Sequence, residues 1–196
     1  MQKKKKMFGF GKVIINNKPI TRIGLDSGVL VALIDNNQEY TLKRPEFFIK
    51  KGICYIYQLV VNQAIGVLIY KRKYPKEKAI QETLNFLDEN NILLLREEKI
   101  DTDKRNKILN DLKSQRNKLK VIPRPEDSDL DIISSYKCEG IDCIITTNYK
   151  HFIELGNYLG IRIERIETEK QKDRRESDKI MREFFWRPKK NFKRFK

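Results

Sequence analysis

The stretch "IDCIITTNYKHF", from Ile141 to Phe152, indicates the fold class of this chain. Four apolar residues among the first five lead directly into two threonines, an asparagine and the aromatic-rich start of a helix. This order is typical of a buried parallel strand that opens into a loop, and in open α/β sheets the loops at the carboxyl ends of the strands carry ligands. A metal site would place an aspartate in this loop, whereas the chain has Asn148.

The segments on either side alternate between strand and helix. Residues 22–35 predict a short buried strand, a turn at Asp26 and an apolar helix, so Asp26 lies where a strand ends and can also cap the helix. The other expected elements are a short strand and a long apolar helix over 53–74, an amphipathic helix over 75–91, a second buried strand over 92–97, a charged helix over 101–120, a brief strand over 121–123, helices over 124–140 and 149–160, and an edge strand over 161–167.

This alternation predicts an α/β fold, a three-layer α/β/α sandwich around a central, mostly parallel sheet. The length of 196 residues fits one domain with appended segments. We expect a basic N-terminal arm over 1–19, the domain over 20–166, and a basic, aromatic C-terminal tail over 167–196.

The charge balance favours a polyanionic partner. Lysine and arginine number 42 against 27 acidic residues, which gives a formal net charge of +15. Nucleic acid is the first expectation and an anionic membrane surface the second. No apolar stretch approaches the ~18 residues of a membrane span. The three cysteines form no CxxC pair, and the lone His151 completes no obvious zinc set. We therefore expect reduced thiols and a cytoplasmic protein.

Polar side chains stand at three strand ends or helix starts: Asp26, the cluster of Asp127, Asp129 and Asp131, and Asn148. Converging carboxylates repel one another unless a divalent cation joins them. Mg²⁺ and Mn²⁺ take such oxygen ligands and can activate water for phosphodiester cleavage. Helix caps and solvated turns are the alternative for each residue taken singly.

Taken in order, the segments from about Ile20 to Ile166 resemble the PIN-domain nucleases. "LDSGVLVALID" matches the family's first strand, its Asp and the helix that follows. "NQAIGVLIY" matches the helix that carries its second acid, and Gln63 occupies that position. The third acid corresponds to Asp129, and "TTNYKHF" matches the loop of the fourth, with Asn148 in the place of the acid.

The resemblance implies four catalytic positions at Asp26, Gln63, Asp129 and Asn148. Two of them are amides, so the implied Mg²⁺ or Mn²⁺ site is weakened and keeps Asp26 and Asp129 as its carboxylate ligands. Asp127 is considered as a substitute that swings inward, whereas Asp131 is expected to point to another face of its helix.

Three functional interpretations follow. The first is a Mg²⁺- or Mn²⁺-dependent endoribonuclease or a weakened derivative of one. The alternative is a catalytically degenerate PIN domain that binds RNA, or supports ribonucleoprotein assembly, without cleaving. The third is a chain in which acids were deliberately exchanged for amides to trap a complex. Expected partners are RNA, with ribosomal and transfer RNA as candidates, and a second copy of the chain or a ribonucleoprotein, but no membrane.

The C-terminal segment from Arg182 to Lys196 combines seven cations with five aromatic residues. Cations that neutralise phosphates and rings on which bases stack are suited to single-stranded or looped RNA. Packing of Phe184, Phe185 and Trp186 on the domain is the alternative for the rings. The candidate RNA-binding residues are Arg182, Trp186, Arg187, Lys189, Lys190, Lys193 and Arg194.

Overall fold

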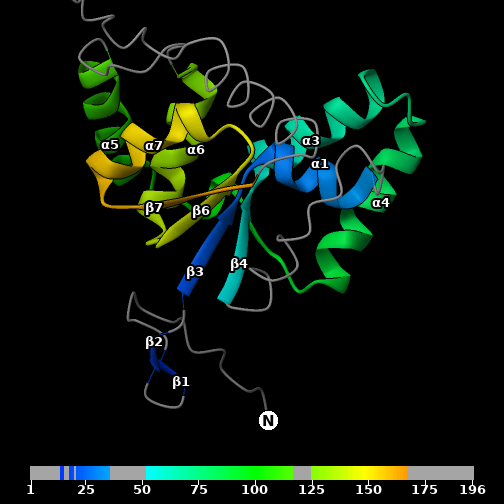
Figure 1. Cartoon of the computed structure of the whole chain (residues 1–196), viewed down its shortest axis with the longest axis horizontal. Helices are drawn as coiled ribbons and strands as arrows, with labels where there is room; N and C mark the ends of the chain where they lie inside the picture. The colour runs from blue at the N-terminus through cyan, green and yellow to red at the C-terminus, as the bar shows by residue number, and fades with distance from the viewer. Residues whose placement is uncertain (1–13, 16–17, 20, 36–51, 117–124, 167–196) are drawn as a thin grey trace, which may run out of the picture.

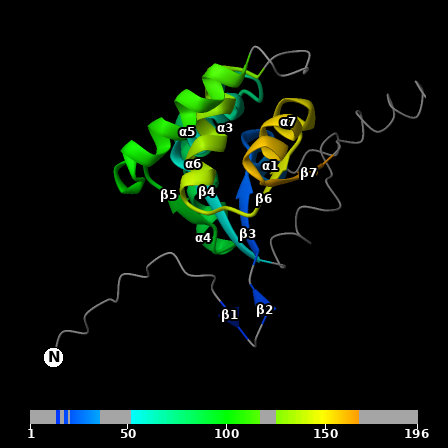
Figure 2. The same ribbon diagram turned by 90° about the vertical axis from the view of Figure 1, so that its left-hand side faces the viewer.

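The structure is a computed structural model, and it describes residues 14–15, 18–19, 21–35, 52–116 and 125–166. The predicted strand over 121–123 and the C-terminal tail lie outside these residues, as does most of the N-terminal arm. Within the arm, strands β1 (Ile14–Ile15) and β2 (Lys18–Pro19) pair antiparallel. Figure 2 shows this pair near the amino end of the first strand of the main sheet. The predicted domain boundaries stay predictions.

The central sheet has five parallel strands, which confirms the predicted fold class (Figure 1). The strands are β3 (Thr21–Leu25), β4 (Gly52–Tyr57), β5 (Leu93–Leu95), β6 (Cys143–Thr146) and β7 (Arg162–Arg165). Their order is β5-β4-β3-β6-β7. The chain therefore moves outward from β3 to β5, then returns to place β6 beside β3 on the other side. In sheets of this kind, ligands bind at the carboxyl ends of the two strands where the order reverses.

Six α-helices among the described residues cover the two faces of the sheet. They are α1 (Ser27–Asp35), α3 (Gln58–Tyr70), α4 (Lys76–Glu89), α5 (Thr102–Gln115), α6 (Asp127–Cys138) and α7 (Tyr149–Leu159), and a short 3-10 helix, η2 (Glu97–Lys99), precedes α5. Helix α1 packs against α3 and α4, whereas α6 packs against α5 and α7. Figure 1 shows these two groups on opposite sides of the sheet, which gives the predicted three layers.

The core lies between the sheet and the two helical layers. All four residues of β6 are buried, as the apolar run at its centre predicts. Strand β5 corrects a prediction, because it was expected to be buried. It forms an edge of the sheet, it is only three residues long, and the side chain of Leu93 is 48% exposed. Apolar composition alone does not distinguish an edge strand from a central one.

Helix α7 approaches β7 unusually closely at Gly156. A methyl group on this glycine would lie 2.4 Å from Cγ1 of Ile163 and 2.7 Å from the carbonyl oxygen of Ile161. Gly160, with φ +67°, then ends α7 in the left-handed conformation, as its position in the sequence predicts. The absence of a side chain at Gly156 thus lets α7 pack on the edge of the sheet, which fixes the helix that begins at the β6 loop.

Candidate functional site

The switch in strand order brings the end of β3 against the end of β6. The backbone N–H of Asp26 donates to the carbonyl of Ile145 at 3.0 Å. The hydroxyl of Thr146 donates to Oδ2 of Asp26 at 2.7 Å and accepts from the N–H of Asn148 at 2.8 Å. One buried threonine therefore connects the two polar strand ends that the sequence analysis singled out.

Asp26 is nearly inaccessible, with 6% of its surface exposed. Its Oδ1 accepts from the N–H of Ser27 at 2.7 Å. Burial raises the pKa of the Asp26 carboxyl, the hydrogen bonds from Thr146 and Ser27 oppose this, and the nearby charge of Asp129 raises it further. The folded state therefore disfavours the ionised form of this residue.

Replacing Asp26 with Asn is expected to remove a pH-dependent loss of stability, so the variant should lose less stability than the wild type as the pH rises from 3 to 8. In the wild type, the unfolded chain loses its Asp26 proton near the ordinary pKa of ~3.9, while the folded chain holds it to higher pH. Wild-type stability should therefore fall as the pH rises between these two pKa values, whereas the variant lacks this loss. Urea unfolding of both proteins from pH 3 to pH 8 measures the difference.

The matched control is Asp88→Asn on the exposed face of α4, which should change stability by no more than about 0.5 kcal/mol at any pH. A stability difference between Asp26→Asn and the wild type that stays constant with pH would contradict this account. The removed carboxylate would then not be the group whose proton binding differs between the folded and unfolded states.

Asp129 lies in the first turn of α6 and faces the loop after β6. A capping box fixes its position, because the N–H of Glu126 donates to Oδ2 of Asp129 at 2.9 Å. The same oxygen lies 2.8 Å from Nδ1 of His151. The side chains of Asp129 and His151 are each 13% exposed, so the pair is largely shielded but reachable from outside.

His151 joins the site from the first turn of α7, three residues after Asn148. Nδ2 of Asn148 lies 2.8 Å from Nδ1 of His151, and Asn148 itself precedes the helix at its N-cap. From the sequence, His151 was considered only as a zinc ligand, and its contacts with Asn148 and Asp129 were not predicted. The available signal was the i, i+3 spacing, which places two residues on the same side of a helix start.

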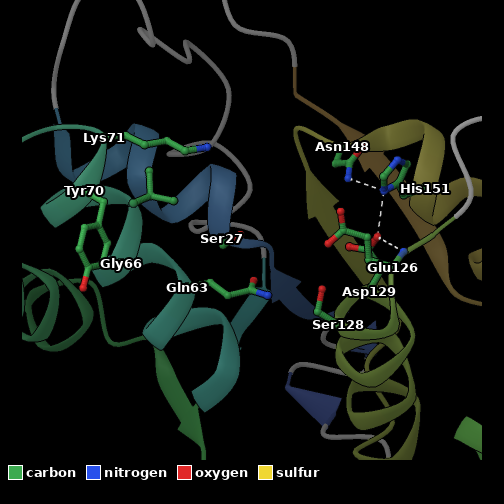
Figure 3. Close-up of a pocket in the computed structure, with 11 residues that line it drawn as sticks. Ser27, Gln63, Gly66, Tyr70, Lys71, Glu126, Ser128, Asp129, Asn148 and His151 are labelled. Atoms are coloured by element: carbon green, nitrogen blue, oxygen red, sulfur yellow. Dashed lines mark hydrogen bonds and ion pairs between the residues drawn. The ribbon is translucent and has the colours of Figure 1, made fainter.

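Most of these groups line one cavity of about 560 Å³ (Figure 3). Three of the four predicted positions line it: Gln63 from α3, Asp129 from α6 and Asn148. Asp26 does not line the cavity, but its neighbour Ser27 does. The other lining residues, which the sequence analysis did not foresee, are Gly66, Val67, Tyr70, Lys71, Glu126, Ser128 and His151.

The pocket has two walls that come from the two helical layers. Figure 3 shows Gln63 and Lys71 on the wall formed by α3 and its end, with both side chains extending toward the opposite wall. That wall carries Asp129, Asn148 and His151. A substrate in the pocket would therefore meet an amide and a cation on one side and a carboxylate with its imidazole on the other.

Asp127 and Asp131 do not supply the missing charges. Oδ1 of Asp127 pairs with Nη1 of Arg116 at 2.6 Å, and its side chain is 75% exposed. Oδ1 of Asp131 pairs with Nη2 of Arg105 at 2.6 Å, on the side of α6 that faces α5. Neither residue lines the pocket. The expectation that Asp131 points elsewhere is confirmed, and Asp127 does not turn inward.

The polar groups of the pocket do not fit a divalent cation. In the described part of the chain, no three His, Cys, Asp or Glu side chains are grouped to hold a metal ion. Both carboxylate oxygens of Asp26 accept hydrogen bonds, and Oδ2 of Asp129 meets a backbone N–H and His151. Lys71 adds a positive charge to the same cavity. The donor set is therefore poorer than the four-acid pattern to which the sequence is similar.

No family model matches the sequence. No curated protein matches it either. The fold, however, is similar to that of VapBC2 from Rickettsia felis, solved bound to a DNA fragment from their promoter. The TM-score is 0.55 and the identity 16%, over 75% of this chain and 100% of that one. It is also similar to Mycobacterium tuberculosis VapC20, a Sarcin-Ricin loop cleaving toxin, with a TM-score of 0.51 and 9% identity over 71% and 98% of the two chains. The chain therefore shares the fold of these structures, as the resemblance to PIN domains predicts.

No helix in the described ranges combines the length and the apolar character that crossing a membrane would require.

Proposed function

We propose that this chain is an RNA-directed protein that binds RNA at the pocket where β3 and β6 end. The observation that carries the proposal is the pocket itself, in which Gln63, Asp129 and Asn148 meet at the switch point of a PIN-like sheet with Lys71 beside them. A cation and two amides suit the phosphates and base edges of RNA. The cleaving activity in the name of VapC20, which shares the fold, supports an RNA target.

Mg²⁺- or Mn²⁺-dependent cleavage by this pocket is proposed to be weak. Asp26 and Asp129 are the two carboxylates that the sequence predicts as metal ligands, but Asp26 does not line the pocket and both of its oxygens already accept hydrogen bonds. The amides at Gln63 and Asn148 bring no charge, and Lys71 opposes a cation. If the protein binds RNA but cleaves none with either metal, the chain is a non-cleaving RNA-binding module.

The basic C-terminal segment from Arg182 to Lys196, which lies outside the described residues, is proposed to add RNA affinity with little sequence selectivity. Each cation that contacts a phosphate on a single strand releases ~0.7 of a counterion, so the logarithm of affinity falls with the logarithm of salt concentration. The pocket and the tail should therefore contribute separately to the salt slope, because Lys71 belongs to one and seven cations to the other.

Lys71→Gln is expected to reduce the salt slope for single-stranded RNA by about 0.7, the value for one lost phosphate contact. Removal of residues 182–196 is expected to reduce it by roughly 3–5, if about that many cations touch phosphate. The measurement is fluorescence anisotropy of labelled RNA at four or more salt concentrations. Lys107→Gln is the matched control, because Lys107 is exposed on α5 and does not line the pocket.

Equal slopes for Lys71→Gln and Lys107→Gln would place the RNA away from the pocket. A truncated protein that keeps the affinity and the slope would show that the tail takes no part. Trp186→Ala separates stacking from charge, since it should weaken binding at every salt concentration while leaving the slope unchanged.

We also propose that the chain associates with a protein partner. The neighbour from Rickettsia felis was solved as a VapBC2 assembly with DNA. Leu84 on α4 and Leu93 on β5 are each about half exposed in this chain, which leaves apolar surface for contact. A second copy of the chain and a ribonucleoprotein stay predictions from the sequence, and sedimentation of the full chain with and without RNA tests both.

A further inference from the structure

One face of α3 forms a wall of the pocket. The residues of this helix that line the cavity are Gln63, Gly66, Val67 and Tyr70, and their spacing is that of a single helical face. Gly66 stands in the middle of the helix, where glycine is less favourable than alanine. A methyl group at Gly66 would meet nothing within 4 Å, so no packing contact requires the glycine. This face therefore leaves an open space one turn away from Tyr70.

Tyr70 places an exposed aromatic ring at the end of this face (Figure 3). Its surface is 76% exposed, and the ring makes no hydrogen bond or cation–π contact with another described residue. Tyr74, one turn further along the chain, differs in both respects. Its hydroxyl donates to Oδ1 of Asp35 at 3.3 Å, and Nζ of Lys78 lies 5.1 Å from its ring centroid. Tyr74 thus belongs to the fold, whereas the ring of Tyr70 is available to a ligand.

Tyr70 also begins a basic turn between α3 and α4, with the sequence "YKRKYPK" over 70–76. Nε of Arg72 pairs with Oδ2 of Asp35 at 2.9 Å, which ties that cation to the end of α1. Lys71, Lys73 and Lys76 are exposed and form no ion pair with another residue that the structure describes. These three lysines occur within six residues, which span at most about 20 Å even when fully extended. A short row of cations therefore leads away from the pocket.

Lys73 occupies a backbone conformation that is unfavourable for lysine. Its φ is 61°, in the left-handed region that glycine adopts without steric cost. The side chain is exposed, so no buried contact compensates for this cost. Backbone strain of this kind is concentrated at ligand-binding positions, where the side chain is needed for function. The turn therefore keeps a cation beside the pocket at a position where glycine would be the more stable choice.

We propose that an RNA strand enters the pocket along this turn, with one base stacked on Tyr70 and its phosphates on Lys71, Lys73 and Lys76. This inference rests on the proposed function, because it requires RNA in the pocket. A base can stack on a protein ring only where it is unpaired and drawn out of a helix. The open space at Gly66 accommodates this base against the backbone of α3, and Gln63 lies one turn further into the pocket.

The stacking contact is tested by fluorescence anisotropy of labelled single-stranded RNA with the full chain. Tyr70→Ala should weaken binding by roughly 5- to 150-fold at every salt concentration and leave the salt slope unchanged, because stacking releases no ions. Tyr70→Phe keeps the ring and should bind as the wild type does. An abasic ribose-phosphate chain of the same length should bind Tyr70→Ala and the wild type equally. Tyr158→Ala is the matched control, because Tyr158 is 47% exposed on α7 and does not line the pocket.

The phosphate contact is tested with Lys73→Asn, which removes the cation and keeps a residue that tolerates the left-handed backbone. The salt slope for single-stranded RNA should fall by about 0.7, the value for one lost phosphate contact. The stability to urea should be unchanged or higher, because the strained lysine is gone. Lys107→Gln on α5 is again the control for the loss of one exposed cation elsewhere.

Three results would overturn this inference: an unchanged RNA affinity for Tyr70→Ala, equal losses for Tyr70→Ala and Tyr70→Phe, or an unchanged slope for Lys73→Asn. If Lys71→Gln still lowers the slope relative to Lys107→Gln, the proposed function stands without it. Wild-type protein that binds no RNA would overturn both. Tyr70 and Lys73 are exposed, so neither substitution removes a core contact, and melting temperatures within a few degrees of the wild type establish that the variants are folded.

Discussion

The double variant Gln63→Glu with Asn148→Asp is expected to bind Mn²⁺ ~30-fold more tightly than the wild type, on the assumption that each added carboxylate contributes on the order of 1 kcal/mol. Both positions line the pocket that Asp129 also lines, and the charge of Asp129 already acts on Asp26. Four carboxylates would then converge where two stand now. Isothermal calorimetry with Mn²⁺ measures the change directly.

The same variant should be less stable than the wild type without metal and regain stability when Mn²⁺ is added. Four converging carboxylates repel one another, and an ion that binds only the folded state stabilises it by mass action. Gln81→Glu with Asn85→Asp is the matched control. It makes the same two chemical changes at a hydrogen-bonded pair on the exposed face of α4, away from the pocket. Equal Mn²⁺ affinities for the two double variants would show that these side chains share no site.

Gly156→Ala is expected to destabilise the fold by about 1–3 kcal/mol, the usual cost of an overpacked contact. The new methyl group would meet Ile163 and the backbone carbonyl of Ile161, and a backbone carbonyl in a packed strand connection cannot rotate aside as a flexible side chain can. For a chain of this size, the melting temperature should fall by ~2–12 °C. Differential scanning calorimetry measures both quantities.

Gly66→Ala provides the opposite expectation within the same protein. Gly66 is inside α3, and a methyl group there would meet nothing within 4 Å. Alanine should therefore stabilise the helix by ~0.5–1 kcal/mol through its higher helix propensity. Both substitutions replace glycine with alanine, but we expect them to change the stability in opposite directions. The comparison therefore separates the effect of side-chain packing from that of helix propensity. If Gly156→Ala were also stabilising, the close packing of α7 on β7 would be wrong.

Much of this architecture could be predicted because local pattern and tertiary position agree. The run before Thr146 is apolar on every residue except Asp142, and a strand buried on both faces requires such a run. Asp26 and Asn148 follow their strands directly, so the parallel sheet brings them to the same edge. Leu93 follows the same compositional rule but lies at the edge of the sheet, because strand order is decided by long-range pairing that composition does not encode.

The pocket was less predictable than the sheet. Gln63 follows no strand directly, and only the family resemblance indicated that this residue of the long apolar helix belongs to the site. The contact between His151 and Asp129 joins residues from two helices that the sequence separates by a strand and a loop. Lys71 follows the end of α3, where a lysine side chain usually extends into solvent and takes part in no site. Each of these depends on how α3, α6 and α7 pack, which is a property of the assembled layers.

Because the ribosome makes this chain from its N-terminus, the two walls of the pocket are synthesised at different times. Asp26 and Thr146, which hydrogen-bond at the end of the sheet, are 120 positions apart. The wall that carries Gln63 is synthesised early, and the wall that carries Asp129 and His151 is among the last parts of the domain to appear. A nascent chain therefore has half a pocket until β6 closes against β3, a late non-local contact. The complete pocket, and the binding of any ligand that contacts both walls, therefore has to await the synthesis of α7.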